Sequence, residues 1–346
     1  MTQLIIIVGI VLLVAIIFMI MKVNALAEIS KDKNQVVSTS NKVNAFLMLT
    51  FLIAALALFF WYSVARFDEY TLPVASKHGV DIDRMFWVTT AVTGVAFLLT
   101  NILLFFFAFK YRYKENKRAD FFPHNNKLEI WWTVVPAIVL AVLIFDGLDN
   151  WSKIMSPAPK DAEVIEIVGQ QFQWSVRYTG KDKKLGASDY RKIDATNTLG
   201  IDFSDKSSFD DFIPRKMYLP VGRPVEFKIR AKDVLHSVFI PHFRLKMDAV
   251  PGMPTRFWFV PTKTTKEMRI ETKNDDFQYE LACTEICGQG HFTMRMLIEV
   301  VTPEEYDEWF AKQEPWLSKN KDYLSRVPEA LKEVASIKAG ISPASN

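Results

Sequence analysis

Ligand-type side chains gather in one short segment of this 346-residue chain. Residues 283–294 read Cys-Thr-Glu-Ile-Cys-Gly-Gln-Gly-His-Phe-Thr-Met, which places two thiols, an imidazole and a thioether within twelve residues. A second imidazole, His236, stands 47 residues upstream in a segment predicted to be a strand. Thiolate, imidazole and thioether together form the soft ligand set that favours copper. The chain has only two cysteines and five histidines, so their positions are informative.

The second cysteine sets this segment apart from the pattern of a one-copper site. A mononuclear blue-copper site takes one histidine from an upstream strand, and a cysteine, a histidine and a methionine from a later loop. Two thiolates four residues apart can both bridge a pair of copper ions. Each ion then takes one imidazole, and the methionine and a backbone carbonyl complete the shell. Because a bridged pair shares its odd electron, its geometry changes little between redox states, which suits electron transfer.

Three other interpretations of these residues remain open. Two cysteines in an exported domain most often form a disulfide. A tetrahedral zinc site is a second alternative, although zinc prefers thiolate, imidazole and carboxylate ligands to a thioether. A histidine such as His236, taken by itself, is more often a surface or packed residue. The order Cys, Cys, His and Met within one loop favours copper over all three.

The elements that must hold these ligands are short strands. From about Asp161 onward, runs rich in Val, Ile, Phe, Tyr and Trp alternate with polar residues and are broken by Gly, Pro, Asn and Asp. Many short strands at this spacing are typical of an antiparallel sandwich or barrel. The predicted strands are Glu163–Val168, Phe172–Tyr178, Val225–Arg230, Leu235–Ile240, Arg256–Val260, Met268–Thr272, Phe277–Ala282 and Met294–Val301.

Two further segments accompany the predicted strands. Residues 187–215 have no clear period and hold six aspartates, so we interpret them as a surface insertion and a solvated loop. After the last strand, Thr302-Pro303-Glu304-Glu305 provides an N-cap, a proline at the first helical position and a capping-box glutamate. A short helix through Trp309 and Phe310 should follow. We expect residues 302–346 to form a helical C-terminal tail, loosely attached beyond about Pro315.

The N-terminal half is predicted to cross a membrane four times. Four apolar stretches approach the roughly 20 helical residues that a bilayer requires, and half of the whole chain is hydrophobic. We expect a transmembrane domain over residues 1–151, with helices at about 4–22, 45–66, 86–110 and 129–150. Trp131, Trp132 and Trp151 flank the fourth span as an interfacial belt. Pro136 lies inside that span and is expected to kink it.

The distribution of basic residues orients the spans. The loop after the third span and the first loop carry most of the lysines and arginines, which marks the cytoplasmic side. These residues are Lys110, Arg112, Lys114, Lys117, Arg118 and Lys127, and Lys22, Lys31, Lys33 and Lys42. The N-terminus and everything after Trp151 then lie outside. The first span is alternatively a signal peptide with a cleavage site at Ala25-Leu26-Ala27, but the segment before it lacks a positive charge, which favours retention.

Several motifs fall in the order of one known family. They are Glu129-Ile130-Trp131-Trp132-Thr133 with Pro136, Gly169-Gln170-Gln171-Phe172-Gln173-Trp174, Asp233-Val234-Leu235-His236-Ser237, Asp248-Ala249-Val250-Pro251-Gly252, and the segment 283–294. With them the chain resembles subunit II of haem–copper cytochrome c oxidases over roughly residues 86–301. The resemblance implies a cupredoxin-like β-barrel at residues 152–301, with the insertion at about 187–215, on the outer, periplasmic side of a bacterial inner membrane.

The resemblance also assigns a metal site. It implies the binuclear copper centre CuA, with side-chain ligands from five residues and the backbone carbonyl of Glu285 as the sixth. The five are His236, Cys283, Cys287, His291 and Met294. In that family the carboxylate of the glutamate matching Glu285 faces the large subunit and helps to bind a Mg or Mn ion. A merely hydrogen-bonded loop carboxylate is the alternative for Glu285.

Roles in electron and proton entry follow from the same resemblance. Where the family commonly has a tryptophan for electron entry from cytochrome c, this chain has Phe172, and Trp174 matches a different family position. The donor and its route are therefore left open, and the aspartates of the insertion are hypothesised to attract a basic partner. His291 would lie on the exit route to the haem. Glu129 would stand at the mouth of a proton channel, or else be an interfacial acid favoured by a helix N-terminus.

Residue counts restrict the function further. None of the five histidines lies inside an apolar span, so the oxygen-reducing centre must be on another chain, and subunit I of the oxidase is an obligate partner. No Cys-x-x-Cys-His motif is present, so the haem donor, a cytochrome c or similar protein, is separate.

The same counts exclude other functions. Five histidines are too few for a nitrous oxide reductase. A quinol oxidase subunit would not need these ligands, and the net charge of +3 without a basic stripe gives no sign of nucleic-acid binding.

Two alternatives from other functional classes remain. The first is a protein that stores or delivers copper, which should have an open site rich in methionine or cysteine. The second is a structural membrane protein whose two cysteines form a disulfide. The expected closed set of ligands on a folded β-scaffold favours electron transfer over both. The two N-terminal spans are additional to the family's usual pair and are expected to contact lipid and other oxidase subunits.

Overall fold

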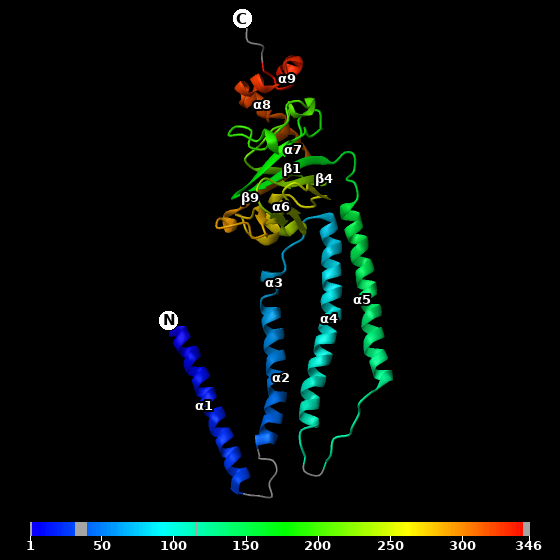
Figure 1. Ribbon diagram of the computed structural model, residues 1–346, viewed down its shortest axis with the longest axis vertical. Helices are drawn as coiled ribbons and strands as arrows, with labels where there is room; N and C mark the ends of the chain where they lie inside the picture. Colours follow the sequence, from blue (N-terminus) through cyan, green and yellow to red (C-terminus); the bar gives the residue numbers. More distant parts are fainter. Residues whose placement is uncertain (1, 32–39, 115–116, 342–346) are drawn as a thin grey trace. The chain divides into compact units, whose positions relative to one another are not determined.

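The computed structural model describes residues 2–31, 40–114 and 117–341 (Figure 1). The chain divides into two compact units. The first unit comprises residues 1–71 and 87–140, and the second comprises residues 72–86 and 141–346. Lys33, which we used to orient the first loop, lies outside the described residues. Each unit is considered by itself below.

The first unit is helical. It holds α1 (Thr2–Lys31), α2 (Ser40–Ala65), the short α3 (Phe67–Tyr70), most of α4 (Lys77–Lys110) and the first half of α5 (Asn126–Met155). Four of these helices are long and apolar enough to cross a membrane, as predicted, and each extends beyond its predicted apolar stretch. The ring centroids of Phe46 and Phe109 are 5.1 Å apart, and those of Phe59 and Phe97 are 6.1 Å apart. Aromatic contacts therefore join α2, one of the two additional spans, to α4.

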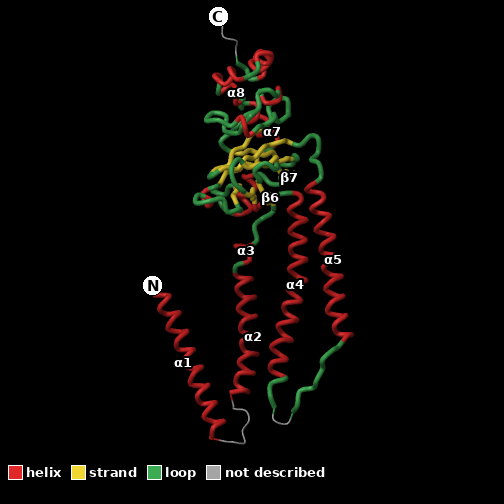
Figure 2. The backbone as a smooth tube through the Cα atoms, in the orientation of Figure 1, coloured by secondary structure: helices red, strands yellow, loops and turns green. Residues whose placement is uncertain are grey.

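The second unit contains two β-sheets, whose strands are yellow in Figure 2. One sheet has the strand order β2-β1-β4-β7 and the other β3-β9-β8-β5-β6. The strands are β1 (Glu163–Gln170), β2 (Gln173–Tyr178), β3 (Met217–Pro220), β4 (Val225–Ala231), β5 (His236–Ile240), β6 (Leu245–Ala249), β7 (Thr255–Phe259), β8 (Tyr279–Cys283) and β9 (Arg295–Val301). Alternate residues along these strands, such as Ile165, Ile167, Phe227 and Ile229, are fully buried in the core of the domain. The predicted fold class, membrane helices followed by a cupredoxin-like β-domain and a helical tail, is confirmed.

The details of the sheets differ from the prediction in three places. The pairs β1–β4 and β3–β9 are parallel, so the domain is not antiparallel throughout. Residues 268–272, predicted as a strand, form the end of helix α6 (Thr265–Thr272). The cause is a capping box: the Thr264 hydroxyl accepts from the Glu267 N–H, and the Glu267 carboxylate accepts from the Thr264 N–H. Strands β3 and β6 were not predicted: β3 is short and lacks a clear alternation, whereas Leu-Lys-Met-Asp-Ala of β6 does alternate, and that signal was missed.

The insertion and the C-terminal tail together form a second hydrophobic core. Leu199, Ile201, Phe203 and Phe209 of the insertion are buried against apolar residues of the tail, namely Leu317, Val327, Ala335 and Ala339. The predictions of a solvated loop and of a loosely attached tail were therefore wrong. Neither segment has an apolar period of its own, so the sequence did not reveal that each covers the other. The tail consists of α7 (Pro303–Ala311), α8 (Trp316–Lys319), η5 (Lys321–Arg326), η6 (Glu329–Leu331) and α9 (Lys332–Lys338).

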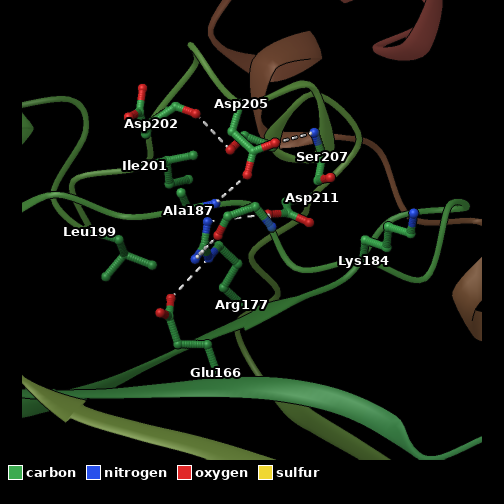
Figure 3. A network of polar contacts seen from close by, with 12 residues as sticks. Glu166, Arg177, Lys184, Ala187, Leu199, Ile201, Asp202, Asp205, Ser207 and Asp211 are labelled. Carbon is green, nitrogen blue, oxygen red and sulfur yellow. Dashed lines mark hydrogen bonds and ion pairs between the residues drawn. The ribbon is translucent and has the colours of Figure 1, made fainter. Parts of the chain in front are cut away.

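The six aspartates of the insertion, which also contains η1 (Tyr190–Lys192) and η2 (Lys206–Ser208), all have partners within the chain. Asp205 accepts from the backbone N–H groups of Ala187 and Ser207, and Asp211 accepts from Arg177 and from the Gly186 N–H (Figure 3). The remaining pairs are Asp189 with Arg191, Asp194 with Arg326, Asp202 with Lys192, and Asp210 with Lys338. These carboxylates fold the insertion, and this disfavours the hypothesis that they attract a basic partner.

The second unit also includes the N-terminal end of α4. The Arg244 guanidinium donates to both carboxylate oxygens of Asp83, over 2.6 and 2.9 Å. The His242 Nδ1–H donates to the Pro73 carbonyl over 2.9 Å. Burial lowers the pKa of His242, which keeps the imidazole neutral. The β-domain is thus attached to the start of the helix by paired and mostly buried polar groups.

Candidate metal centre

Two elements of one sheet bring the first ligands together. Strand β5 begins at His236, and strand β8 ends at Cys283. The two strands pair antiparallel, with Val238 opposite Cys283. The Cys283 Sγ lies 3.9 Å from the His236 Nδ1 and 4.0 Å from the Cys287 Sγ. Ligand atoms of these three residues all lie within 4.8 Å of one another.

The loop between β8 and β9 supplies the other donor atoms. The Cys287 Sγ lies 3.5 Å from the His291 Nδ1 and 3.3 Å from the Met294 Sδ. The Glu285 carbonyl oxygen lies 3.3 Å from the Cys283 Sγ. The Cys283 N–H donates to the Met294 carbonyl, which closes the base of the loop. The structure therefore gathers all six residues that the sequence proposed as ligands.

The centre is largely shielded from water. His236, Cys283, Cys287 and Met294 are buried, and His291 is half-buried. Both cysteines are free, since their sulfurs lie well beyond the length of a disulfide bond. Burial, together with the neighbouring Cys283, raises the pKa of the Cys287 thiol to about 11. A metal that binds the thiolate must therefore displace a proton.

The chemistry of the donor set fits a pair of copper ions. Each thiol has one imidazole beside it, His236 at Cys283 and His291 at Cys287. Thioether and thiolate sulfur with imidazole nitrogen are ligands that soft ions prefer. The sulfurs are free, buried and close together, as a bridging role requires. A zinc site would instead call for four tetrahedral ligands of thiolate, imidazole or carboxylate type.

Asp233 contributes to the site although sequence reasoning gave it no role. One of its carboxylate oxygens accepts a hydrogen bond from the His236 Nε2–H, over 2.9 Å. In the neutral imidazole this leaves Nδ1, the nitrogen that faces Cys283, without a proton. Such a carboxylate commonly orients a metal-bound histidine. An acid three residues before a candidate ligand was the signal that could have identified it.

The two aromatic residues proposed for electron entry occupy different environments. Phe172 is 37% exposed and packs against the ligand loop, where a Cβ added at Gly290 would lie 2.6 Å from its ring. Trp174 is only 5% exposed, and its ring meets that of His236 edge-on, with centroids 5.8 Å apart. Phe172 is therefore the more accessible of the two to a protein that docks from outside.

The remaining proposed residues are placed as follows. Glu129 lies in the first turn of α5, where its carboxylate accepts from the Asn125 N–H while the Asn125 side chain accepts from the Leu128 N–H. This reciprocal cap provides hydrogen-bond partners for backbone N–H groups at the start of the helix. It agrees with the alternative interpretation of Glu129 as an acid at a helix N-terminus. The Glu285 residue is half-buried in the ligand loop. Glu129 belongs to the first unit, and the ligand cluster to the second.

The fold and this cluster define a class: a membrane-anchored cupredoxin-like domain with a sulfur-rich cluster of candidate metal ligands. Family models match two segments of the chain. Residues 163–301 match the cytochrome c oxidase subunit II periplasmic domain, and residues 71–149 match the transmembrane domain of the same subunit. The chain belongs to the cytochrome c oxidase subunit II family. Members of this family are subunits of haem–copper oxidases, which are oxidoreductases. The periplasmic domain is the part of the subunit that binds CuA in this family.

Two relatives from bacteria agree with this assignment. The alternative cytochrome c oxidase subunit 2 of Bradyrhizobium diazoefficiens is 35% identical over 244 residues, which covers 70% of this chain and 83% of that protein. The probable subunit 2 of Rickettsia bellii is 30% identical over 67% of this chain and 77% of its own length. The solved periplasmic domain of subunit II of Bradyrhizobium japonicum cytochrome oxidase is 26% identical, covering 44% of this chain and 94% of that one, with a TM-score of 0.30.

Proposed function

We propose that this chain is the electron-entry subunit of a proton-pumping terminal oxidase in a bacterial inner membrane. It accepts electrons on the periplasmic side from a cytochrome c-type donor and delivers them to a haem of subunit I, where oxygen is reduced to water. The observation that carries the proposal is the convergence of two thiols, two imidazoles, a thioether and a carbonyl in one buried cluster.

The residues of the cluster would bind the metal through side chains and through one backbone carbonyl. His236, Cys283, Cys287, His291 and Met294 would be the side-chain ligands, and Glu285 would contribute its carbonyl. A bound copper pair supplies one-electron redox chemistry with little change in geometry. The chain fixes the donor atoms on β5, β8 and the loop between β8 and β9, and excludes water from most of them. Rigid and dry surroundings lower the reorganisation that accompanies electron transfer.

The surface around the cluster suggests where electrons enter and leave. Phe172 is accessible and packs on the ligand loop, which supports a donor docking beside it, whereas Trp174 is buried in the core. His291 is the half-exposed imidazole of the cluster, which suits the exit route toward subunit I. The Glu285 carboxylate is proposed to reach a Mg or Mn ion at that interface. Glu129 is proposed as the entrance for protons.

A substitution of one bridging cysteine tests the proposal. In the full-length protein within its purified oxidase, Cys287→Ser removes a thiolate that the copper pair requires. We expect loss of the electron paramagnetic resonance signal of one electron shared by two copper nuclei. We also expect turnover with the reduced donor to fall by about a hundredfold or more, because loss of a ligand should cost at least as much as the 10- to 100-fold typical of its outer-shell partners. Thr284→Ser, an exposed change in the same loop, should leave both unchanged.

Two results would contradict the proposal. Undiminished turnover of the Cys287→Ser enzyme would show that electrons take another path. A one-copper signal in the unsubstituted protein, or a Cys283–Cys287 disulfide in place of metal, would instead favour copper delivery or a structural role.

A further inference from the structure

Gln171 contacts both halves of the ligand cluster from the turn between β1 and β2. The cluster is assembled from separate elements, because His236 comes from β5 and both cysteines come from β8 and the loop after it. The Gln171 backbone N–H donates to a carboxylate oxygen of Asp233 over 2.7 Å. The Gln171 side-chain amide donates to the Cys287 carbonyl over 2.6 Å. A single residue thus links the partner of one ligand to the backbone of another.

The hydrogen bonds around Asp233 leave it little freedom. One carboxylate oxygen accepts from the His236 Nε2–H and from the Val234 N–H, and the other accepts from Gln171. A shift of the Gln171 backbone would therefore displace the Asp233 carboxylate, which orients the His236 ring. A loss of its side-chain amide would release the Cys287 carbonyl, whose residue carries a thiolate of the cluster.

Close packing holds Gln171 against the ligand loop. A Cβ added at Gly288 would lie 2.9 Å from the Gln171 amide nitrogen and 3.0 Å from the Phe172 ring. Gly288 also has a φ of +133°, which a residue with a side chain rarely adopts. The loop can therefore approach the turn this closely only because glycine occupies that position.

We propose that Gln171 is a positioning residue of the metal centre, which fixes the Cys287 thiolate relative to His236. The inference rests on the proposed copper site and deepens it. Outer-shell groups that orient the ligands of a metal typically change its affinity by 10- to 100-fold when removed. Electron transfer places a further demand on such groups, because every movement of a ligand between redox states slows the reaction.

Gln171 also invites a simpler explanation. It is exposed and lies next to Phe172, so it could serve only as part of the surface on which the donor docks. The two roles make opposite predictions. A docking residue changes the KM for the donor and leaves the metal centre unaltered, whereas a positioning residue alters the centre even when no donor is present.

The test compares Gln171→Leu with Gln170→Leu in the purified full-length oxidase. Leucine keeps an uncharged side chain and the backbone N–H, but it cannot donate to the Cys287 carbonyl. Gln170 is a matched control, because it is the same residue type one position earlier, and in the described part of the chain its side chain has one hydrogen bond, which it accepts from Lys232 over 3.4 Å. Copper release to bathocuproine disulfonate under reducing conditions and the paramagnetic resonance spectrum of the oxidised centre are recorded for both.

We expect Gln171→Leu to release copper about tenfold faster and to show altered copper hyperfine splitting, while Gln170→Leu behaves as the unsubstituted protein. Gln171→Asn, whose shorter amide cannot reach the carbonyl, should give the same result and replaces Gln171→Leu if that variant does not assemble. An unchanged spectrum and release rate with a raised KM for the donor would overturn the inference and leave the proposed function intact. Absence of any two-copper signal in the unsubstituted protein would overturn both.

Discussion

At the scale of single residues, the centre depends on a glycine that is not a ligand. Gly169 in β1 lies against the rings of both His236 and Trp174. An added Cβ would be 2.9 Å from the His236 Cδ2 and 2.9 Å from the Trp174 Cζ3. Carbon atoms in protein cores do not approach so closely, and neither ring has room to retreat, because both residues are buried.

We therefore expect Gly169→Ala to displace His236. Overpacking of this kind costs about 1–3 kcal/mol of stability. Because His236 supplies one of the two imidazoles, copper content should also fall below two ions per chain. Thermal unfolding and metal analysis check both effects. Gly94→Ala, in a helix where an added Cβ meets nothing within 4 Å, is the control. Full copper occupancy in Gly169→Ala would show that the histidine has another way to reach its position.

At the scale of elements, a buried arginine connects the insertion to the first sheet. Arg177 on β2 is fully buried and donates to Glu166 of β1, to Asp211 and to the Gly186 carbonyl (Figure 3). Arg230 of β4 also pairs with Glu166, and it donates to the Leu199 carbonyl in the insertion. These charges lie where water cannot solvate them, so each depends on its partner.

Replacement of Arg177 by Met should destabilise the exported domain by about 3–5 kcal/mol, because the buried Asp211 loses the guanidinium that it pairs with, and the buried Glu166 keeps only Arg230. The insertion should also become more sensitive to protease, since its link to β2 is broken. Chemical unfolding and limited proteolysis measure the two effects. Arg191→Met serves as the control: Arg191 is mostly exposed and pairs with Asp189 within the insertion itself, so a change within about 0.5 kcal/mol is expected. Equal stability of the two variants would refute the structural role of Arg177.

At the scale of the whole molecule, the described part of the exported unit has two hydrophobic cores that contain different segments of the chain. The first lies between the two sheets and includes Cys283, Cys287 and Met294 of the ligand cluster. The second joins the insertion to the C-terminal tail, where Phe203 stacks on Trp316 at 5.4 Å and Leu317 is fully buried. The ligand cluster thus belongs to one core, and the tail belongs to the other.

This division predicts that damage to the second core spares the metal centre. Leu317→Ala should cost about 2–5 kcal/mol, the usual range for a leucine truncated in a core. Proteolysis should then increase in residues 187–215 and in the tail together, while the copper spectrum stays unchanged. Lys319→Ala, an exposed change in the same helix, controls for an effect of the helix alone. A changed copper spectrum in Leu317→Ala would mean that the two cores act as one.

The sequence by itself determined the elements whose signals are local. Four apolar helices follow from length and composition alone, and α7 begins at the predicted proline with the predicted capping box of Thr302 and Glu305. The candidate ligands were also predictable, because five of the six lie in one twelve-residue segment where order and spacing reveal the chemistry. The sixth, His236, was identified by its residue type and by the family resemblance.

Only the tertiary structure decided which distant residues support that segment. The pairing of β5 with β8 places His236 beside Cys283, and the turn after β1 brings Gln171 to the Cys287 carbonyl. Neither contact has a local sequence signal, because each joins residues that are far apart in the chain. The same holds for the insertion and the tail, whose scattered apolar residues form a core only when the two segments meet. Burial and long-range hydrogen bonds depend on how the whole chain packs, and a single sequence does not display that packing.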